Sequence, residues 1–406
     1  MRVGVYIGEV GATLGGAFTF QQDVLQALIS VAGTSEHDFV LLGQLHESDA
    51  VAARAAGFEI AELKRSSRAA SLFGHFSEIV FESPLLLLRA AGLKTRLDRL
   101  VTRLRLDVVW FVTPLYEPTD TPYIFTVWDL QHRAQPWFPE VSSSGRWDFR
   151  EKTYSRVIPR ALKVIASNQA ARAELERFYH VPPERVMMLP HPTPAFARGA
   201  SDAAEVSIER FGLRNPFVLY PAQFWPHKNH VGLLRAVRWF KDHHGIDLDI
   251  ALVGHNWGNR AHVERVAKRL GLEEHTKFLG FVSRPELVAL YRKAAALVYL
   301  TFFGPENLPP LEAFALRCPV IVARYAGAEE QLGSAALLVD PTDAAEVGAA
   351  IHRVISDAEL RSQLLERGTT RAASWSPVDY VTSVMQELDR FAPIRACWGD
   401  QRMPIA

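Results

Sequence analysis

Residues 304–315 form the most informative stretch of this sequence. They read Gly304-Pro305-Glu306-Asn307-Leu308-Pro309-Pro310-Leu311-Glu312-Ala313-Phe314-Ala315. An apolar run at Leu297–Leu300 comes just before and predicts a buried strand. Consecutive prolines suit the first turn of a helix, where a missing backbone N–H costs no hydrogen bond. We therefore predict a strand–loop–helix unit in which the free amides of Asn307 and Leu308, with the positive end of the helix dipole, bind an anion.

Two similar units surround this stretch. Gln223 and Lys228 follow a predicted strand at Phe217–Pro221, and a lysine at such a position can neutralise a diphosphate. Gly254 ends the next predicted strand and would allow a ligand to approach the backbone closely. Glu312 lies about one turn inside its predicted helix, where a carboxylate could accept two hydroxyl groups. The alternative is an ordinary helix start, with Glu312 as a solvated surface acid.

Apolar runs alternate with helical patterns along the whole chain, which is typical of parallel α/β units. The other predicted strands are Val3–Ile7, Phe39–Leu42, Val108–Phe111, Ile124–Val127, Val164–Ala166, Val186–Leu189, Asp249–Val253, Thr276–Leu279, Val320–Ala323 and Ala336–Val339. The main predicted helices are Thr19–Ala32, Arg146–Ala161, Gln169–Phe178, His230–His244, Arg260–Leu270, Pro285–Ala295, Pro309–Arg317 and Ala344–Ser356. Three prolines within residues 190–194 interrupt the pattern and indicate a connection between domains. We predict two doubly wound α/β domains facing each other across a cleft, at 1–195 and 196–375, with a helix and tail at 376–406 returning to the first.

Composition narrows the class of protein. The 406 residues include 45 Lys and Arg against 45 Asp and Glu, and this balance argues against a general nucleic-acid binder. Two cysteines, Cys318 and Cys397, cannot build a disulfide framework, so a reducing compartment is expected. Apolar runs fall short of the roughly 20 residues that cross a bilayer. We expect a cytoplasmic protein, with the inner face of the cytoplasmic membrane as a second location.

Polar residues also follow two predicted strands of the first half. Gly15 and Gly16 lie in a glycine-rich loop after Val3–Ile7, where the backbone could approach a phosphate, although many such pairs are simple turns. The loop lacks the spacing of the dinucleotide fingerprint, which disfavours an NAD enzyme. Asp129 and His132 follow Ile124–Val127 and could emerge into the cleft. The alternative there is a capped loop with His132 on the surface.

Taken together, these motifs resemble those of the retaining glycosyltransferases of family 4, which have the GT-B fold of two Rossmann-like domains. The resemblance covers nearly the whole chain, and its order and spacing are strongest in residues 217–342. It implies a donor site with these members: Gly15, Gly16, Gln223 and Lys228 near the diphosphate, Gly254 under the nucleotide, Phe281 and Val282 beside the base, Asn307, Leu308 and Pro309 at the diphosphate, and Glu312 on the ribose.

The sequence departs from the family pattern at three positions. Gly304 stands where the family has a glutamate that touches the donor sugar, and Glu306 is a candidate replacement. Gln223 stands where an arginine is common, and a neutral amide gives no charge-assisted contact. Trp128 stands where the family has a histidine. The catalytic candidates implied by the resemblance are Asp129, His132, Lys228 and Glu306.

The resemblance implies transfer of a hexose, of mannosyl, rhamnosyl or glucosyl type, from a nucleotide diphosphate sugar. The acceptor would be a hydroxyl of a glycan or lipid-linked oligosaccharide of a bacterial envelope polysaccharide such as O-antigen. The anomeric configuration would be retained, and neither a metal ion nor a resident cofactor would be needed. Two alternatives stay open: a GT-B sugar-nucleotide epimerase or hydrolase, and a non-catalytic partner that binds nucleotide sugar or glycan.

Two further segments carry weaker signals. Residues 64–105 are basic and leucine-rich, which is typical of contact with an anionic membrane surface but equally of the core face of a domain helix. Asp247 and Asp249 have a spacing that binds divalent cations in another glycosyltransferase fold, but they precede a strand and more simply cap a turn. No histidine or cysteine motif with metal-ligand spacing is present.

Overall fold

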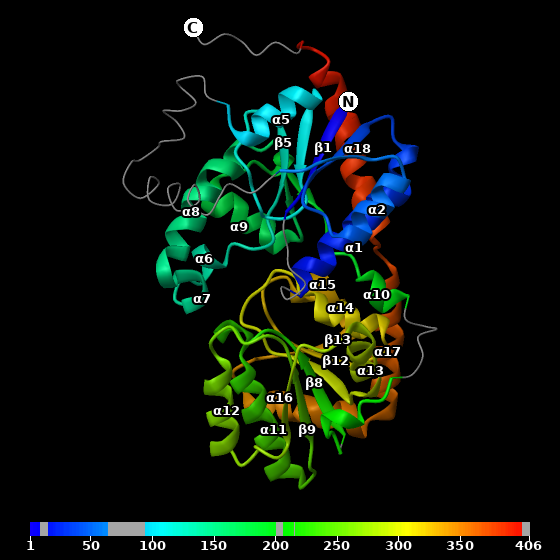
Figure 1. Ribbon diagram of the computed structural model, residues 1–406. Helices are drawn as coiled ribbons and strands as arrows, with labels where there is room; N and C mark the ends of the chain where they lie inside the picture. The colour runs from blue at the N-terminus through cyan, green and yellow to red at the C-terminus, as the bar shows by residue number, and fades with distance from the viewer. Residues whose placement is uncertain (9–14, 64–93, 200–205, 215, 400–406) are drawn as a thin grey trace.

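The computed structural model describes residues 1–8, 15–63, 94–199, 206–214 and 216–399. These residues form an elongated molecule of two lobes, each with a parallel β-sheet between helices (Figure 1). Helix α14 and the loop before it lie where the two lobes meet. The predicted fold class, two Rossmann-like domains of the GT-B kind, is confirmed.

The first sheet has seven strands in the order β3-β2-β1-β4-β5-β6-β7, and all neighbours are parallel. The strand order reverses between β1 and β4, and the carboxyl ends beside such a switch point are the usual ligand site of these sheets. Its strands are β1 (Arg2–Ile7), β2 (Asp38–Gly43), β3 (Glu59–Ala61), β4 (Val108–Phe111), β5 (Tyr123–Thr126), β6 (Lys163–Ala166) and β7 (Val186–Met188).

The second sheet has six parallel strands in the order β10-β9-β8-β11-β12-β13, so its switch point lies between β8 and β11. Its strands are β8 (Phe217–Pro221), β9 (Asp249–Val253), β10 (Thr276–Gly280), β11 (Ala296–Tyr299), β12 (Val320–Ala323) and β13 (Ala336–Val339). The predicted motifs at Lys228 and Leu308 therefore follow the two strands on either side of this switch point.

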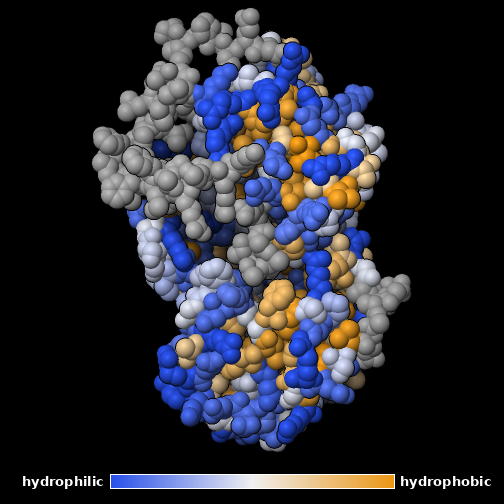
Figure 2. Space-filling view, in the orientation of Figure 1, coloured by the Kyte–Doolittle hydropathy of each residue, from blue (hydrophilic) through white to orange (hydrophobic). Residues whose placement is uncertain are grey.

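Helices cover both sheets, and hydrophilic side chains gather over α11 and α12 at the lower end of the molecule (Figure 2). In the first lobe they are α1 (Gly16–Val31), α2 (Glu47–Ala55), α5 (Arg96–Leu104), α6 (Gln131–Ala134), α7 (Pro139–Ser142), α8 (Arg146–Val157) and α9 (Gln169–Tyr179). After the connection come α10 (Ala195–Arg198), α11 (His230–His244), α12 (Arg260–Arg269), α13 (Arg284–Lys293), α14 (Leu308–Ala315), α15 (Ala328–Leu332), α16 (Ala344–Ser356), α17 (Ala358–Ala373) and α18 (Pro377–Arg395).

Helix α18 lies along the first lobe although it follows the helices of the second lobe in the chain (Figure 1). Its buried side chains, among them Tyr380 and Leu388, belong to the core that also holds Val3, Val5 and Phe20. The ring of Tyr380 packs edge-on against Phe20, with centroids 5.4 Å apart. The last helix therefore fastens the second half of the chain to the first sheet. The proposed domain limits at 195 and 375 stay predictions.

Local chemistry explains where the elements differ from expectation. Helix α8 ends at Val157 and not near Ala161, because Pro159 has no N–H to continue the hydrogen-bond ladder. A capping box starts α13: the backbone N–H of Ser283 donates to Glu286 Oε2 at 2.9 Å. Strand β3 was not expected, because three residues are too few to show a periodic pattern.

Candidate active site

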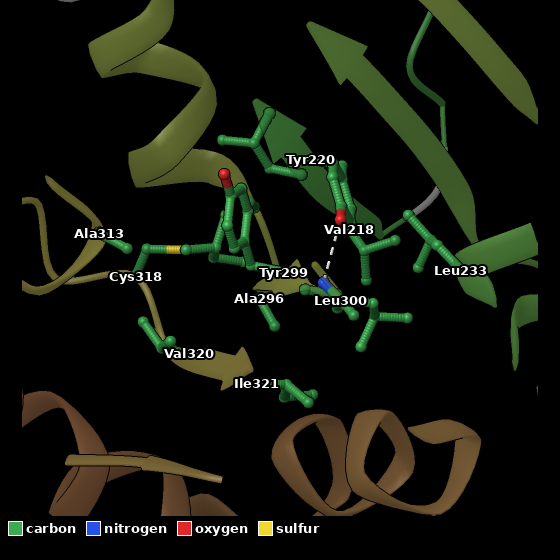
Figure 3. Close-up of a cluster of buried hydrophobic side chains, with 14 of the residues drawn as sticks. Val218, Tyr220, Leu233, Ala296, Tyr299, Leu300, Ala313, Cys318, Val320 and Ile321 are labelled. Carbon is green, nitrogen blue, oxygen red and sulfur yellow. Dashed lines mark hydrogen bonds between the residues drawn. The ribbon is translucent and has the colours of Figure 1, made fainter. Parts of the chain in front are cut away.

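Lys228 lies in a short 3₁₀ turn, Pro226–Lys228, directly after β8. The hydroxyl of Tyr220 on β8 donates to the Lys228 carbonyl and accepts from the Leu300 N–H at 3.1 Å, which ties the turn to both strands of the switch point (Figure 3). The Lys228 ammonium donates to Asn307 Oδ1 at 3.3 Å and lies 5.3 Å from the centre of the Tyr299 ring. Burial lowers its pKa to about 8. The Lys228 ammonium is therefore partly desolvated. An anionic ligand bound beside it would favour its charged form.

The start of α14 lies beside this lysine. Of the two backbone amides predicted to bind an anion there, the Asn307 amide already has a partner within the protein. The backbone N–H of Asn307 donates to Gln331 Oε1 at 3.1 Å, and Gln331 Nε2 donates back to the Asn307 carbonyl at 2.7 Å. The expectation that both amides face an anion is therefore wrong for Asn307. Pro309 and Pro310 have no N–H, so Leu308 supplies the amide of the first helical turn.

Glu312 lies one turn inside α14 and is buried, not solvated. Its Oε2 accepts a hydrogen bond from the Tyr291 hydroxyl at 2.6 Å. Burial raises its pKa to about 7. A buried carboxylate with one oxygen already paired has acceptor capacity left for a ligand hydroxyl.

The first domain places Asp129 on the opposite side of the cleft. Its Oδ1 accepts from Arg150 Nη2 at 2.8 Å and from the Gln131 N–H at 2.9 Å. Burial alone would raise the pKa of Asp129, but the Arg150 guanidinium, the Gln131 N–H and His227 together outweigh it, and the pKa lies below the usual range. The charge of Asp129 acts on Lys228 and His227 of the second domain, so the three groups share one electrostatic environment.

A second carboxylate bridges the two domains. Glu140 Oε1 of α7 accepts from the His227 backbone N–H at 3.0 Å and from His227 Nδ1 at 2.5 Å. Beside this pair the rings of Phe138 and Phe302 stack with centroids 6.0 Å apart. The residue next to Lys228 is therefore fixed from the first domain. Neither Glu140 nor Arg150 could be found from sequence, because each meets a partner more than 20 positions away.

The glycine-rich loop also reaches the second domain. Gly15 caps α1 with a positive φ of 59°, a conformation that favours glycine. A Cβ on Gly16 would lie 3.2 Å from Leu308 Cδ1, and one on Gly15 would lie 3.8 Å from Gln223 Nε2. The structure therefore brings Gly15, Gly16, Gln223 and Leu308 together, as the sequence predicts. Residues 9–14 of this loop lie outside the described residues.

Glu306, the candidate replacement for the carboxylate missing at Gly304, is paired with His191 in this structure. Its Oε2 accepts from the His191 backbone N–H at 2.6 Å and from His191 Nδ1 at 3.0 Å, and its side chain is only 3% exposed. Glu306 thus fastens the α14 loop to the interdomain connection. Gly304 itself has a φ of 132°, and a Cβ there would lie 2.9 Å from Asn307 Nδ2, so a glutamate would not fit this backbone.

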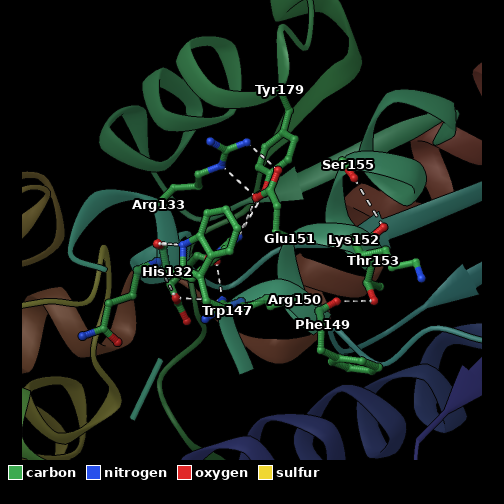
Figure 4. A network of polar contacts seen from close by, with 12 residues as sticks. His132, Arg133, Trp147, Phe149, Arg150, Glu151, Lys152, Thr153, Ser155 and Tyr179 are labelled. Atoms are coloured by element: carbon green, nitrogen blue, oxygen red, sulfur yellow. Dashed lines mark hydrogen bonds and ion pairs between the residues drawn. The ribbon is translucent and has the colours of Figure 1, made fainter. Parts of the chain in front are cut away.

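His132 is not a cleft residue, nor does it lie on the surface. Its ring is completely buried, and Nε2 lies 3.0 Å from the Tyr179 hydroxyl and 3.3 Å from Glu151 Oε2 (Figure 4). Burial lowers its pKa to about 4. Arg133 completes the network by donating to Glu151 Oε2 at 2.7 Å. His132 therefore joins α6 to α8 and α9, and the expectation that its side chain emerges into the cleft is wrong.

Three residues predicted for the donor site, Gly254, Val282 and Phe281, differ in how they could meet a nucleotide. A Cβ on Gly254 would lie 2.2 Å from the Ala222 carbonyl oxygen, so the neighbouring backbone, not a ligand, requires glycine there. Val282 is buried in the second core, and only its backbone could border a base. Phe281 is 68% exposed and free to meet one. Trp128 packs in the first core against Phe20, with ring centroids 5.7 Å apart.

The basic leucine-rich segment is described only from residue 94. Within α5, four apolar side chains are buried in a hydrophobic cluster of the first domain that also holds Val40 and Phe111, which confirms the core-face interpretation for this helix; they are Leu97, Leu100, Val101 and Leu104. Residues 64–93 lie outside the described residues. Among the helices that the structure describes, none is long and apolar enough to cross a membrane. The described residues also contain no group of three or more His, Cys, Asp or Glu that could hold a metal ion.

Two facing parallel sheets with a site at their switch points define the GT-B class of glycosyltransferase folds. The solved structure of Anabaena Alr3699/HepE in complex with UDP and glucose has this fold; it aligns with a TM-score of 0.65 and 16% identity over 96% of this chain and 100% of that one. The chain belongs to the family 4, group 1 glycosyltransferases. The model "Glycosyl transferases group 1" matches residues 204–371, and "Glycosyltransferase Family 4" matches residues 41–195.

Curated relatives match part of the chain. An Escherichia coli O-antigen chain mannosyltransferase B is 25% identical over 59% of this chain and 63% of its own length. A D-inositol 3-phosphate glycosyltransferase of Corynebacterium kroppenstedtii is 25% identical over 61% of this chain and 58% of its own length. The chain thus spans less than two thirds of the length of these relatives.

Proposed function

We propose that the protein transfers a hexose from a nucleotide diphosphate sugar to a hydroxyl of a glycan or lipid-linked acceptor. The observation that carries this proposal is that the Lys228 ammonium contacts the Asn307 side chain at the start of α14, at the switch point of the second sheet, while Gly16 of the first domain lies against Leu308. A cation and an N-terminal helix turn favour a diphosphate, and they favour it more as negative charge grows during its departure. Glu312 would hold the ribose.

Catalysis in this proposal depends on positioning and on electrostatic stabilisation. The departing diphosphate itself accepts the proton of the incoming hydroxyl, on the same face that it leaves, which retains the anomeric configuration. Asp129 is held by Arg150 as an ionised acceptor. It would keep Lys228 protonated and would orient a hydroxyl; no step requires a metal ion.

The sugar and the acceptor follow only by analogy. The O-antigen mannosyltransferase relative favours a mannosyl or related hexose, and a bacterial envelope polysaccharide as the product. Such synthesis would place the protein in the cytoplasm, at the inner face of the membrane. A second candidate function is a partner that binds nucleotide sugar without turnover. It is favoured by Gly304, which supplies no carboxylate, and by Glu306, which is buried against His191.

The test is incubation with GDP-mannose, UDP-glucose and dTDP-rhamnose in the presence of lipid-linked glycan extracted from membranes. We expect one donor to release its nucleoside diphosphate only when acceptor is present. Release without acceptor would indicate a hydrolase, and conversion of the donor an epimerase. Donor binding with no turnover under any condition would contradict the proposal and support the binding partner.

A further inference from the structure

The first domain contains a hollow of about 180 Å³ that the proposed donor site does not use. It lies at the carboxyl ends of β1 and β2, between α1 and α2, and Ile7 and Gly8 line its floor. The switch point of this sheet lies on the other side of β1, next to β4. The hollow is therefore a separate site beside the cleft, not part of the switch point.

The lining is rich in neutral hydrogen-bonding groups. The lining includes the side-chain amides of Gln21, Gln22 and Gln44 and the carboxylate of Asp49, which accepts from Gln26 Nε2 at 3.1 Å and from Gln22 Nε2 at 3.5 Å. Among the described lining residues there is no lysine or arginine. The nearby cation Arg284 of α13 is directed to the rim, where it donates to Gln22 Oε1 at 2.8 Å. This lining suits hydroxyl groups and opposes a phosphate.

Gln21 offers an acceptor that the protein leaves unused. The residue is only 6% exposed, and its Nε2 donates to the Gly8 carbonyl at 3.0 Å. Its Oε1 is buried and has no hydrogen-bond partner within the described part of the chain. A buried acceptor without a partner destabilises the folded protein unless a ligand or water pairs with it.

Shape agrees with this chemistry. Leu25 and Leu45 give the hollow an apolar wall beside its amides, as the C–H face of a pyranose ring requires. The volume of about 180 Å³ is many times the ~10–15 Å³ that one water molecule requires, so the hollow has room for a small polar molecule. We propose that the hollow binds one neutral sugar residue of a glycan acceptor, a residue other than the one that receives the transferred hexose. The proposal rests on the proposed function, because it assumes a glycan acceptor.

Saturation-transfer NMR with methyl α-D-mannoside, methyl α-D-glucoside and methyl α-L-rhamnoside tests this site directly. GDP and UDP are added at saturating concentration, so that the donor cleft is occupied. We expect at least one neutral glycoside to bind, and mannose 6-phosphate and glucose 6-phosphate to bind at least about tenfold more weakly. Gln44→Ala and His46→Ala change exposed lining residues and should each weaken binding several-fold. Gln386→Ala, an exposed glutamine of α18, is the matched control and should change nothing.

Each result decides the proposal. Equal or tighter binding of the phosphorylated sugars would overturn it, and so would the absence of any binding or binding that ignores Gln44→Ala and His46→Ala. The donor assay is scored separately. Transfer activity without sugar binding in the hollow would contradict this inference and leave the proposed function supported. Sugar binding in the hollow without transfer would contradict the proposed function and leave the sugar site supported.

Discussion

At the scale of single residues, Lys228 is a cation whose charge depends on pH. Burial lowers its pKa to about 8, and a bound diphosphate favours the ammonium form. Donor affinity should therefore be complete below about pH 8 and decline as the pH rises through that value. Lys228→Ala should lower turnover at least ~tenfold and abolish this pH dependence. The measurement is the donor KM as a function of pH, with Lys241→Ala, a surface lysine paired with Asp247, as control. A KM that is flat above pH 8 in the wild type would contradict the assignment.

Replacing Glu312 with glutamine should increase the stability of the protein at pH 8 but weaken donor binding. Burial raises its pKa to about 7, so the folded state holds a proton that the unfolded chain releases near its ordinary value. Stability is therefore present at low pH and is lost as the pH rises toward 7 and beyond. Glu312→Gln removes this penalty and should stabilise the protein at pH 8 by on the order of 1–3 kcal/mol, with little gain at pH 5.

The same substitution should weaken donor binding about tenfold, because an amide has one acceptor oxygen where a carboxylate has two. Thermal unfolding at the two pH values and a donor titration measure the two effects. A less stable variant at pH 8 would show that Glu312 is not penalised by burial. Unchanged donor affinity would show that it does not meet the ribose.

At the scale of secondary-structure elements, the loop before α14 is held from the first domain. Glu306 contacts His191, and the Pro305 carbonyl accepts from Asn168 Nδ2 at 2.7 Å. A double-mutant cycle of His191→Ala and Glu306→Gln should give a coupling energy of at least ~1 kcal/mol in urea denaturation, because the pair is buried. The exposed pair Arg238–Asp242 is the matched control, for which about 0.5 kcal/mol or less is expected. Equal coupling in the two pairs would contradict the anchoring role of Glu306.

The strands and helices could be predicted from the sequence more completely than the contacts of the candidate site. All described strands except β3 could be predicted, because continuous apolar runs mark strands that are buried on both faces. Pro309-Pro310 marked the start of α14 to within one residue. The site was less predictable. The Asn307 amide is taken by Gln331, Glu306 is taken by His191, and His132 is buried beneath Tyr179. Each contact joins residues far apart in the chain, which no local pattern reports.

At the scale of the whole molecule, the proposed function requires both domains. Glu140 and Asp129 act on the His227–Lys228 turn from across the cleft, and α18 fastens the chain to its first sheet. The proposed donor site therefore depends on the arrangement of the two lobes and not on one domain alone.

A crystal structure of the protein with a bound nucleoside diphosphate tests this arrangement most directly. We expect the diphosphate to lie within hydrogen-bond distance of the Lys228 ammonium and the Leu308 amide, with the ribose on Glu312 and the Gly15–Gly16 turn against the phosphates. A nucleotide bound elsewhere, with Lys228 still paired to Asn307 and no ligand at the start of α14, would contradict the donor site and the function built on it.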